Sequence, residues 1–221
     1  MSMIALAAGT LLMLQSAGAE IAKAEDARLK ACVEKIETDP ENAYEDGLAW
    51  TFEGNRPGAR QCTALALIAL GNFETGAQRL QALASAPDGG TMEQRALYLS
   101  QAGHAWLQAG APEAAIVSFS DGLKFAPATT DLLLDRATAY IITEKWDEAL
   151  SDLDFALANS PGNPTAHQLR AEVHLNKRAY DLAMRDVNDA MAADPKNIDT
   201  LLVRGRVREA IRIAEEDVVP Q

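Results

Sequence analysis

The sequence has 221 residues and a mass of 23.7 kDa, which is enough for one or two domains with a continuous buried core. With 32 acidic residues against 20 Lys and Arg, the net charge is -12, which argues against nucleic acid and anionic membrane surfaces as partners. The hydrophobic fraction of 48% is typical of globular proteins, and the low aromatic fraction of 5%, with abundant alanine, favours helices over sheets.

The chain begins with an apolar segment. Residues 3–14 carry no charge, and the small-residue triplet Ala17-Gly18-Ala19 follows shortly after them. This pattern predicts a secretory signal peptide over residues 1–19, and hence a periplasmic or secreted protein. The run is shorter than the roughly 20 apolar residues of a membrane span, so membrane contact is expected only if the segment stays uncleaved. No Lys or Arg precedes the run, and a buried first helix of the fold is the alternative.

Two cysteines, Cys32 and Cys62, lie in the first third of the chain. In an oxidising compartment they are expected to pair as a disulfide, and the alternative is two buried thiols that act as small apolar side chains. Two isolated sulfurs without a nearby histidine do not form a tetrahedral set, so the sequence predicts no metal site and no cofactor.

A repeat with a period of about 34 residues runs through the second half of the sequence. Five sets of similar residues recur at one common spacing: Pro127, Pro161 and Pro195; Ala115, Ala149 and Ala183; Gly103, Ala137, Ala171 and Gly205; Trp106, Tyr140 and His174; and Phe119, Leu153 and Val187. Each unit holds two amphipathic stretches, and each proline follows the second of them, where it ends a helix. Helical hairpins that cannot cover their own apolar faces must stack on their neighbours, so the sequence predicts an all-α solenoid.

This pattern of small residue, aromatic residue, alanine and proline resembles the tetratricopeptide repeat (TPR) family, whose fold is a right-handed α-solenoid of stacked helix-turn-helix repeats. The resemblance identifies three full units within 96–197, a C-terminal capping helix over 198–217 and a divergent unit over 56–90, in which Leu83 replaces a small residue. Upstream, residues 20–55 are predicted to form a pair of helices, the first ending at Pro40.

The resemblance implies that the first helix of each unit lines a concave groove. The groove positions that it implies are Leu97, Ser100, His104, Leu107, Gln108, Asp131, Leu134, Asp135, Thr138, Ile141, Ile142, Thr165, Gln168, Glu172, Leu175 and Asn176. None of these is Lys or Arg. One subgroup of the family holds the C-terminal carboxylate of chaperones with Lys, Asn and Arg in the groove, and the corresponding positions here are Ser100, His104, Asp135, Thr165 and Leu169. A neutral or basic peptide segment is therefore the expected ligand.

The sequence contains no phosphate-binding Gly-rich loop, nucleophile elbow or zinc-protease motif, so neither an enzyme nor a small-molecule substrate is expected. His167 and His174 occupy packing positions of the repeat and are predicted to be core residues, and Asp152 with Asp154 is predicted to form a solvated outer face. The sequence thus predicts an adaptor or scaffold of the cell envelope that binds a protein or peptide. The alternative is a structural or self-assembling protein that uses its end helices or convex face.

Overall fold

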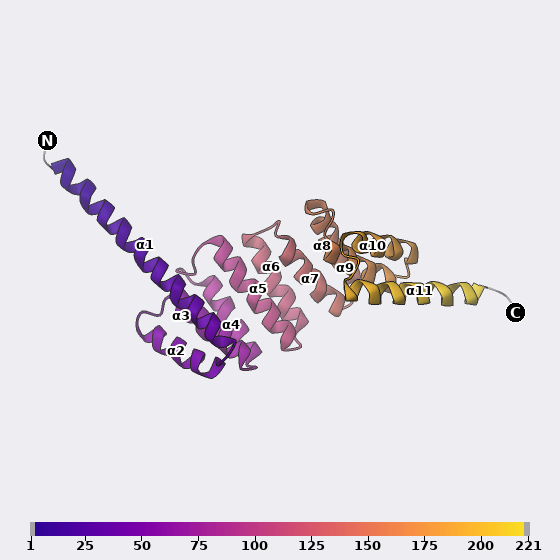
Figure 1. The fold of residues 1–221 in the computed structure, drawn as a ribbon, viewed down its shortest axis with the longest axis horizontal. Helices are drawn as coiled ribbons and strands as arrows, with labels where there is room; N and C mark the ends of the chain where they lie inside the picture. Colours follow the sequence, from indigo (N-terminus) through magenta and orange to yellow (C-terminus); the bar gives the residue numbers. More distant parts are fainter. Residues whose placement is uncertain (1–2, 219–221) are drawn as a thin grey trace. The chain divides into compact units, whose positions relative to one another are not determined.

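The computed structural model describes the backbone of residues 3–218 and the side chains of residues 20–216. Within this range the chain is all-helical, with no strand, which confirms the predicted fold class (Figure 1). It divides into two compact units, Met1–Gly90 and Thr91–Gln221. The predicted signal peptide lies outside the described side chains. No helix among the described residues is long and apolar enough to cross a membrane.

Among the described residues, the first unit contains four helices: α1 (Met3–Ile36), α2 (Pro40–Phe52), α3 (Pro57–Ala69) and α4 (Phe73–Ser85). Pro40 begins α2 and does not end the preceding helix as predicted, since α1 already ends at Ile36. Proline is well suited to the first position of a helix, where its missing N–H has no partner to lose. The Asp39 side chain accepts a hydrogen bond from the Asn42 N–H and caps this start.

A disulfide bond joins Cys32 of α1 to Cys62 of α3, with the two Cα atoms 6.0 Å apart. The two sulfurs lie in a small buried cluster with Trp50 and Ala59. Gly47 of α2 passes so close that an added Cβ would lie 2.9 Å from the Cys62 Sγ. The disulfide and its cluster therefore hold α1, α2 and α3 together.

As far as residue 218, where the described backbone ends, the second unit contains three antiparallel helix pairs followed by a single helix. The pairs are α5 (Met92–Gln108) with α6 (Pro112–Phe125), α7 (Thr130–Ile142) with α8 (Trp146–Asn159), and α9 (Pro164–Asn176) with α10 (Tyr180–Ala193); the last helix is α11 (Ile198–Val218). Each pair corresponds to one predicted repeat. Consecutive pairs contact each other, and the first helices also contact one another in the series α5, α7, α9 and α11.

The small residues of the repeat allow each pair to pack closely. Gly103 of α5 is buried, and a Cβ added there would lie 2.3 Å from the Phe119 ring of α6. The equivalent Ala137 and Ala171 are fully buried. The core of this unit continues through Phe119, Leu153 and related aliphatic residues, so the apolar face of each pair is covered by its neighbour.

The turns inside the three pairs share one backbone conformation. Gly110, Glu144 and Arg178, at the same position of successive repeats, all have positive φ (72°, 57° and 59°). This left-handed residue ends the first helix and lets the chain reverse. The equivalent Arg212 is helical and binds Glu209 and Glu216 on either side along the helix surface. As a result α11 continues straight past the point where the earlier first helices turn, as Figure 1 shows.

Candidate functional site

The candidate site is the surface formed by the first helices α5, α7, α9 and α11, which we call the first-helix face. One side chain from each helix stands at the same position of the repeat: His104, Thr138, Glu172 and Arg206. Because these residues recur once per repeat on helices that lie side by side, they form one row across the unit. This row is the framework of the site.

At one end of the row, His104 contacts Asp135 of the neighbouring helix. The His104 Nε2 lies 3.1 Å from the Asp135 Oδ2, and the ring also packs edge-on against Phe119, with the centroids 5.4 Å apart. The hydrogen bond to Asp135 raises the pKa of His104, and partial burial opposes this only in part. The His104 side chain stays 51% exposed, so a ligand has access to it.

At the other end of the row, the Arg206 Nη1 donates a hydrogen bond to the Glu172 Oε1 at 2.9 Å. This guanidinium is not among the predicted groove residues, because those come from the three full repeats alone. Moving on from Glu172 by one more repeat leads directly to Arg206 on the capping helix. The first-helix face therefore does contain a cation, but a carboxylate of the neighbouring helix already binds it.

The remaining predicted groove residues differ in exposure. Leu97, Gln108, Asp131, Ile142, Thr165 and Asn176 are exposed, whereas Ser100, Leu107, Asp135, Thr138, Ile141, Gln168, Glu172 and Leu175 are half-buried. Leu134 is only 8% exposed and belongs to the core. The surface thus combines exposed aliphatic side chains with an exposed carboxylate at Asp131.

The prediction of a solvated outer face is wrong for Asp152. Its carboxylate is buried and accepts two hydrogen bonds from Arg136, at 2.8 Å from Nε and 2.6 Å from Nη2. Arg170 and Asp186 form the same pair in the next repeat, with the Arg170 Nη2 at 2.7 Å from the Asp186 Oδ1. Each arginine also reaches back to the preceding repeat, where Arg136 binds Ser120 and Arg170 binds Asp154. The two arginines therefore join the helices of their own repeat and also link it to the preceding repeat.

The two remaining histidines, His167 and His174, both lie close to the carboxylate of Asp186. His167 is buried, as predicted, and its Nδ1 lies 3.0 Å from the Asp186 Oδ1. The His174 Nε2 lies 3.6 Å from the other oxygen of Asp186. Burial lowers the pKa of His174, with the charge of Asp186 acting in the opposite direction. The sequence placed both histidines in packing positions but did not indicate that they share an acidic neighbour.

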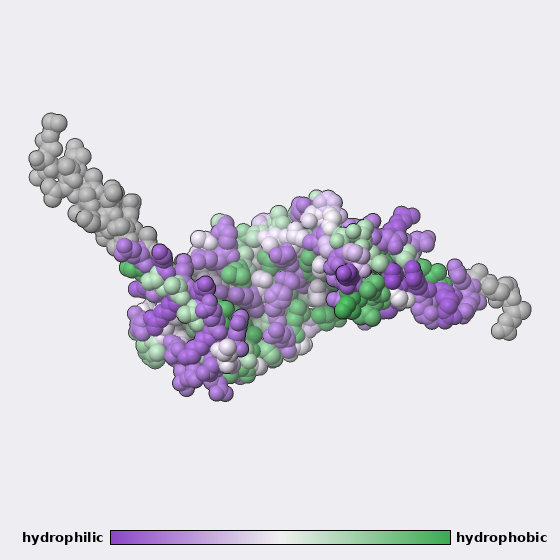
Figure 2. Space-filling view, viewed as in Figure 1, coloured by the Kyte–Doolittle hydropathy of each residue, from purple (hydrophilic) through white to green (hydrophobic). Residues whose placement is uncertain are grey.

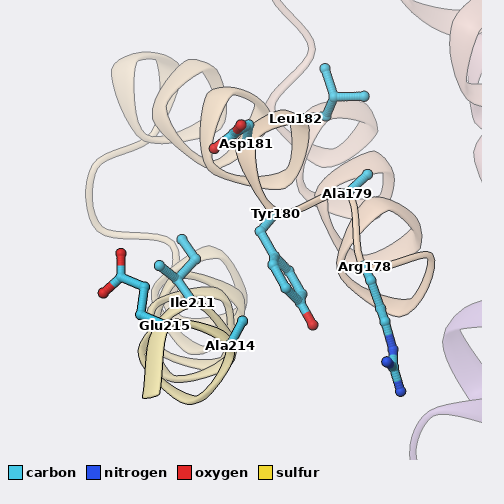
Figure 3. Close-up of a pocket in the computed structure, with 8 residues that line it drawn as sticks. All are labelled: Arg178, Ala179, Tyr180, Asp181, Leu182, Ile211, Ala214 and Glu215. Atoms are coloured by element: carbon cyan, nitrogen blue, oxygen red, sulfur yellow. The ribbon is translucent and has the colours of Figure 1, made fainter. Parts of the chain in front are cut away.

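A pocket lies at the C-terminal end of the second unit, apart from the row described above. It has a volume of about 600 Å³ and is lined by Arg178, Ala179, Tyr180, Asp181, Leu182, Ile211, Ala214 and Glu215. Figure 3 shows the Tyr180 ring between the start of α10 and the extended part of α11. The repeat pattern does not predict this pocket, because the pocket depends on α11 continuing where the earlier first helices turn.

Comparison with solved structures relates this arrangement to known folds. The structure superimposes on MamA 41-end from Desulfovibrio magneticus RS-1 with a TM-score of 0.64 at 17% identity, over 80% of this chain and 97% of that one. It also superimposes on YrrB, described as a TPR protein with an unusual peptide-binding site, with a TM-score of 0.63 at 15% identity, over 81% and 88% of the two chains. The chain has the tetratricopeptide-repeat fold.

Other similarities agree with this fold. The first TPR of Spaghetti (RPAP3), bound to the HSP90 peptide SRMEEVD, matches with a TM-score of 0.52 at 23% identity, over 54% of this chain and 95% of that one. The DnaJ homolog subfamily C member 7 homolog of Dictyostelium discoideum is 26% identical over 163 residues, which are 72% of this chain but only 28% of that protein. No family model matches the sequence.

Proposed function

We propose that this protein is a non-enzymatic interaction module that holds a peptide segment of a partner protein along its first-helix face. The observation that carries this proposal is the row formed by His104, Thr138, Glu172 and Arg206, one side chain from each of four adjacent helices. A row of aligned polar groups, flanked by exposed aliphatic side chains, suits an extended segment that contacts each repeat in turn.

The expected ligand is neutral or basic. Arg206 already binds Glu172, and His104 already binds Asp135, so neither cation is available to an acidic ligand without breaking an ion pair. Asp131 is an exposed carboxylate at the edge of the face, and Leu97 and Ile142 offer apolar contacts. A ligand with one basic and two or more apolar side chains complements these groups.

Similar proteins support a peptide ligand in general but not the HSP90 type in particular. The structure of the first TPR of Spaghetti contains an HSP90 peptide that ends in Glu-Glu-Val-Asp. In this chain the positions that correspond to the carboxylate-binding Lys, Asn and Arg are Ser100, His104, Asp135, Thr165 and Leu169. We therefore place this protein among peptide binders that do not depend on the ligand's terminal carboxylate.

We further propose that the protein works in the cell envelope. The apolar segment at residues 3–14 and the small residues at 17–19 support export, and the Cys32–Cys62 disulfide suits an oxidising compartment. Mass spectrometry of the protein from its own cells tests this proposal. A mature N-terminus at Glu20 and no alkylation without reductant are expected, whereas an intact Met1 with two alkylated cysteines contradicts it.

Affinity capture from native extracts tests the peptide-binding proposal. Asp131→Lys is expected to reduce capture of specific partners at least about tenfold. It replaces the exposed carboxylate that attracts a basic side chain of the ligand with a cation that repels it. Glu148→Lys, an exposed charge reversal at the start of α8, is the matched control and should capture the same partners as the wild type. Equal capture by the wild type and both variants contradicts the proposal.

Self-assembly through the end helix is the second candidate function, and the exposure of α11 favours it. Leu202 is 62% exposed, whereas the equivalent Leu134 in α7 is 8% exposed, and Ile198 is 72% exposed. A Cβ added to Gly205 would meet nothing within 4 Å, unlike one added to Gly103. In Figure 2 apolar side chains reach the surface near the start of α11. Sedimentation of the wild type and of Leu202→Glu separates the two functions. Self-assembly predicts that the wild type is an oligomer and that the variant is a monomer, whereas peptide binding alone requires no oligomer.

A further inference from the structure

His167 occupies a position that is leucine in the two preceding repeats. Leu133 and Leu99, which stand at this position one and two repeats earlier, are buried, and His167 is buried in the same place. A buried imidazole requires polar partners for both ring nitrogens, whereas leucine requires none. The exchange of leucine for histidine in a packed core therefore points to a specific role for the ring.

Both nitrogens of the His167 ring face hydrogen-bond acceptors. The Nε2 lies 2.9 Å from the Pro161 carbonyl oxygen, and the Nδ1 lies 3.0 Å from the Asp186 Oδ1. A carbonyl only accepts, so Nε2 carries a proton. The Nδ1 lone pair of that tautomer then points at a carboxylate, which is favourable only when a second proton or a cation lies between them. Histidines that bind metals commonly donate their other N–H to a backbone carbonyl, as His167 does here.

A second carboxylate completes a set of three donors. Asp189 lies one turn after Asp186 on α10, and it is exposed. One ring nitrogen of His167 and one oxygen from each aspartate lie within 4.8 Å of one another. A central metal ion at about 2.0–2.2 Å from each donor brings tetrahedral donors to roughly 3.3–3.6 Å from one another, so binding draws the three side chains together, and the exposed Asp189 can turn inward. The Arg170 Nε and Nη2 donate to Asp186 and fix the orientation of its carboxylate.

We propose that His167, Asp186 and Asp189 bind a divalent first-row transition-metal ion, for which Zn²⁺ is the best fit. One imidazole nitrogen with two carboxylate oxygens suits Zn²⁺ and other divalent ions of the first transition row. Mg²⁺ and Ca²⁺ prefer oxygen donors alone. The ion takes the place of the second proton between His167 and Asp186, and water completes its coordination. It links α9 to α10 in the third helix pair, which contacts α11.

The preceding repeat shows that the ion pair does not depend on these metal ligands. Arg136 and Asp152 form the same ion pair as Arg170 and Asp186, but the positions equivalent to His167 and Asp189 are Leu133 and Phe155. Among these four positions, the two repeats share the ion pair and differ at the two residues that a metal requires. This internal comparison also supplies the conservative variant His167→Leu.

Thermal unfolding of the full, metal-free chain with added Zn²⁺ tests this proposal. A single site is expected to raise the melting temperature by roughly 5 °C at a hundredfold excess of Zn²⁺ over its dissociation constant. Co²⁺ as a second probe should give a visible absorption band. Asp189→Asn, an exposed change that leaves the core intact, should abolish both effects, and His167→Leu should do the same.

Two variants are the matched controls for this experiment. Asp181→Asn removes another exposed carboxylate of α10. His104→Gln removes a half-exposed histidine that contacts a different aspartate, Asp135. Both should keep the full response to Zn²⁺. A wild-type chain that does not respond, a response that persists undiminished in Asp189→Asn, or a response that disappears in His104→Gln overturns the proposed site.

Discussion

Different interactions stabilise the inside of each of the two units. In the first unit a covalent bond, Cys32–Cys62, joins two helices, and a small cluster around Trp50 surrounds it. In the second unit the same noncovalent contacts recur from one repeat to the next, including the ion pairs Arg136–Asp152 and Arg170–Asp186. Regular repeats can reuse one set of contacts, whereas a unit that departs from the repeat needs a connection of its own.

Removal of the disulfide has the largest expected effect and is confined to the first unit. Cys32→Ala with Cys62→Ala opens a loop with a sequence separation of 30 residues, which should lower the free energy of unfolding of that unit by about 3.5 kcal/mol. Trp50 fluorescence reports this unit when Trp106 and Trp146 are replaced by phenylalanine. An unchanged denaturation midpoint for Trp50 would show that the disulfide contributes little.

Breaking one ion pair tests the contacts of the second unit. Asp152→Asn leaves the Arg136 guanidinium without its buried carboxylate and should cost about 3 kcal/mol of that unit's stability. Asp154→Asn is the control, because Asp154 is exposed and its ion pair with Arg170 should contribute less than about 1 kcal/mol. Chemical denaturation followed through Trp106 and Trp146 measures both. Equal effects of the two variants would contradict the assignment of Asp152 to the core.

Gly103 and Gly205 stand at the same position of the repeat, but Gly103 of α5 is covered by a neighbouring helix and Gly205 of α11 is not. Gly103→Val places methyl groups where the Phe119 ring lies and should destabilise the second unit by about 2 kcal/mol. Gly205→Ala enters open space and should stabilise it by about 0.5–1 kcal/mol, because alanine is the better helix former. Denaturation midpoints that move in the same direction for both variants would contradict the packing of α11.

The smallest expected effect concerns His104. Since Asp135 raises the pKa of His104, its protonated form stabilises the fold: the contribution is fully present below the unfolded-state pKa of about 6.5 and is lost as the pH rises through the higher folded-state value. The ring is half exposed, so the contribution should be about a few tenths of a kcal/mol. Denaturation of the wild type and His104→Gln at pH 5 and pH 8 measures it. A wild type that gains stability relative to the variant at the higher pH would reverse the assignment.

Much of the second unit could be predicted from the sequence because its contacts repeat. The columns of Ala115, Ala149 and Ala183, and of the three prolines, predicted the helix pairs and their spacing. The Arg136–Asp152 pair was missed, although its recurrence in the next repeat is visible in the sequence, because acidic residues on a helix are usually assigned to solvent. Only the packing of neighbouring helices shows that this carboxylate is buried.

The candidate site was predicted less completely than the fold. Resemblance placed His104, Thr138 and Glu172 at equivalent positions, but the pairing of His104 with Asp135 and of Glu172 with Arg206 depends on contacts between neighbouring helices. The pocket beside Tyr180 depends on α11 continuing as a helix, which Arg212 supports by binding Glu209 and Glu216. From sequence alone it is difficult to judge whether such ion pairs stabilise the helix enough to continue it where the earlier repeats form a turn.

Site-specific photocrosslinking in native cells tests the central claim, that the first-helix face holds a partner peptide, most directly. A photoreactive amino acid at Thr138, in the middle of the row, should crosslink to a discrete partner protein, and one at Glu148, exposed on α8, should not. Mass spectrometry of the Thr138 adduct should then identify a neutral or basic segment. Crosslinks from Glu148 but none from Thr138 would contradict the claim and assign partner binding to another surface.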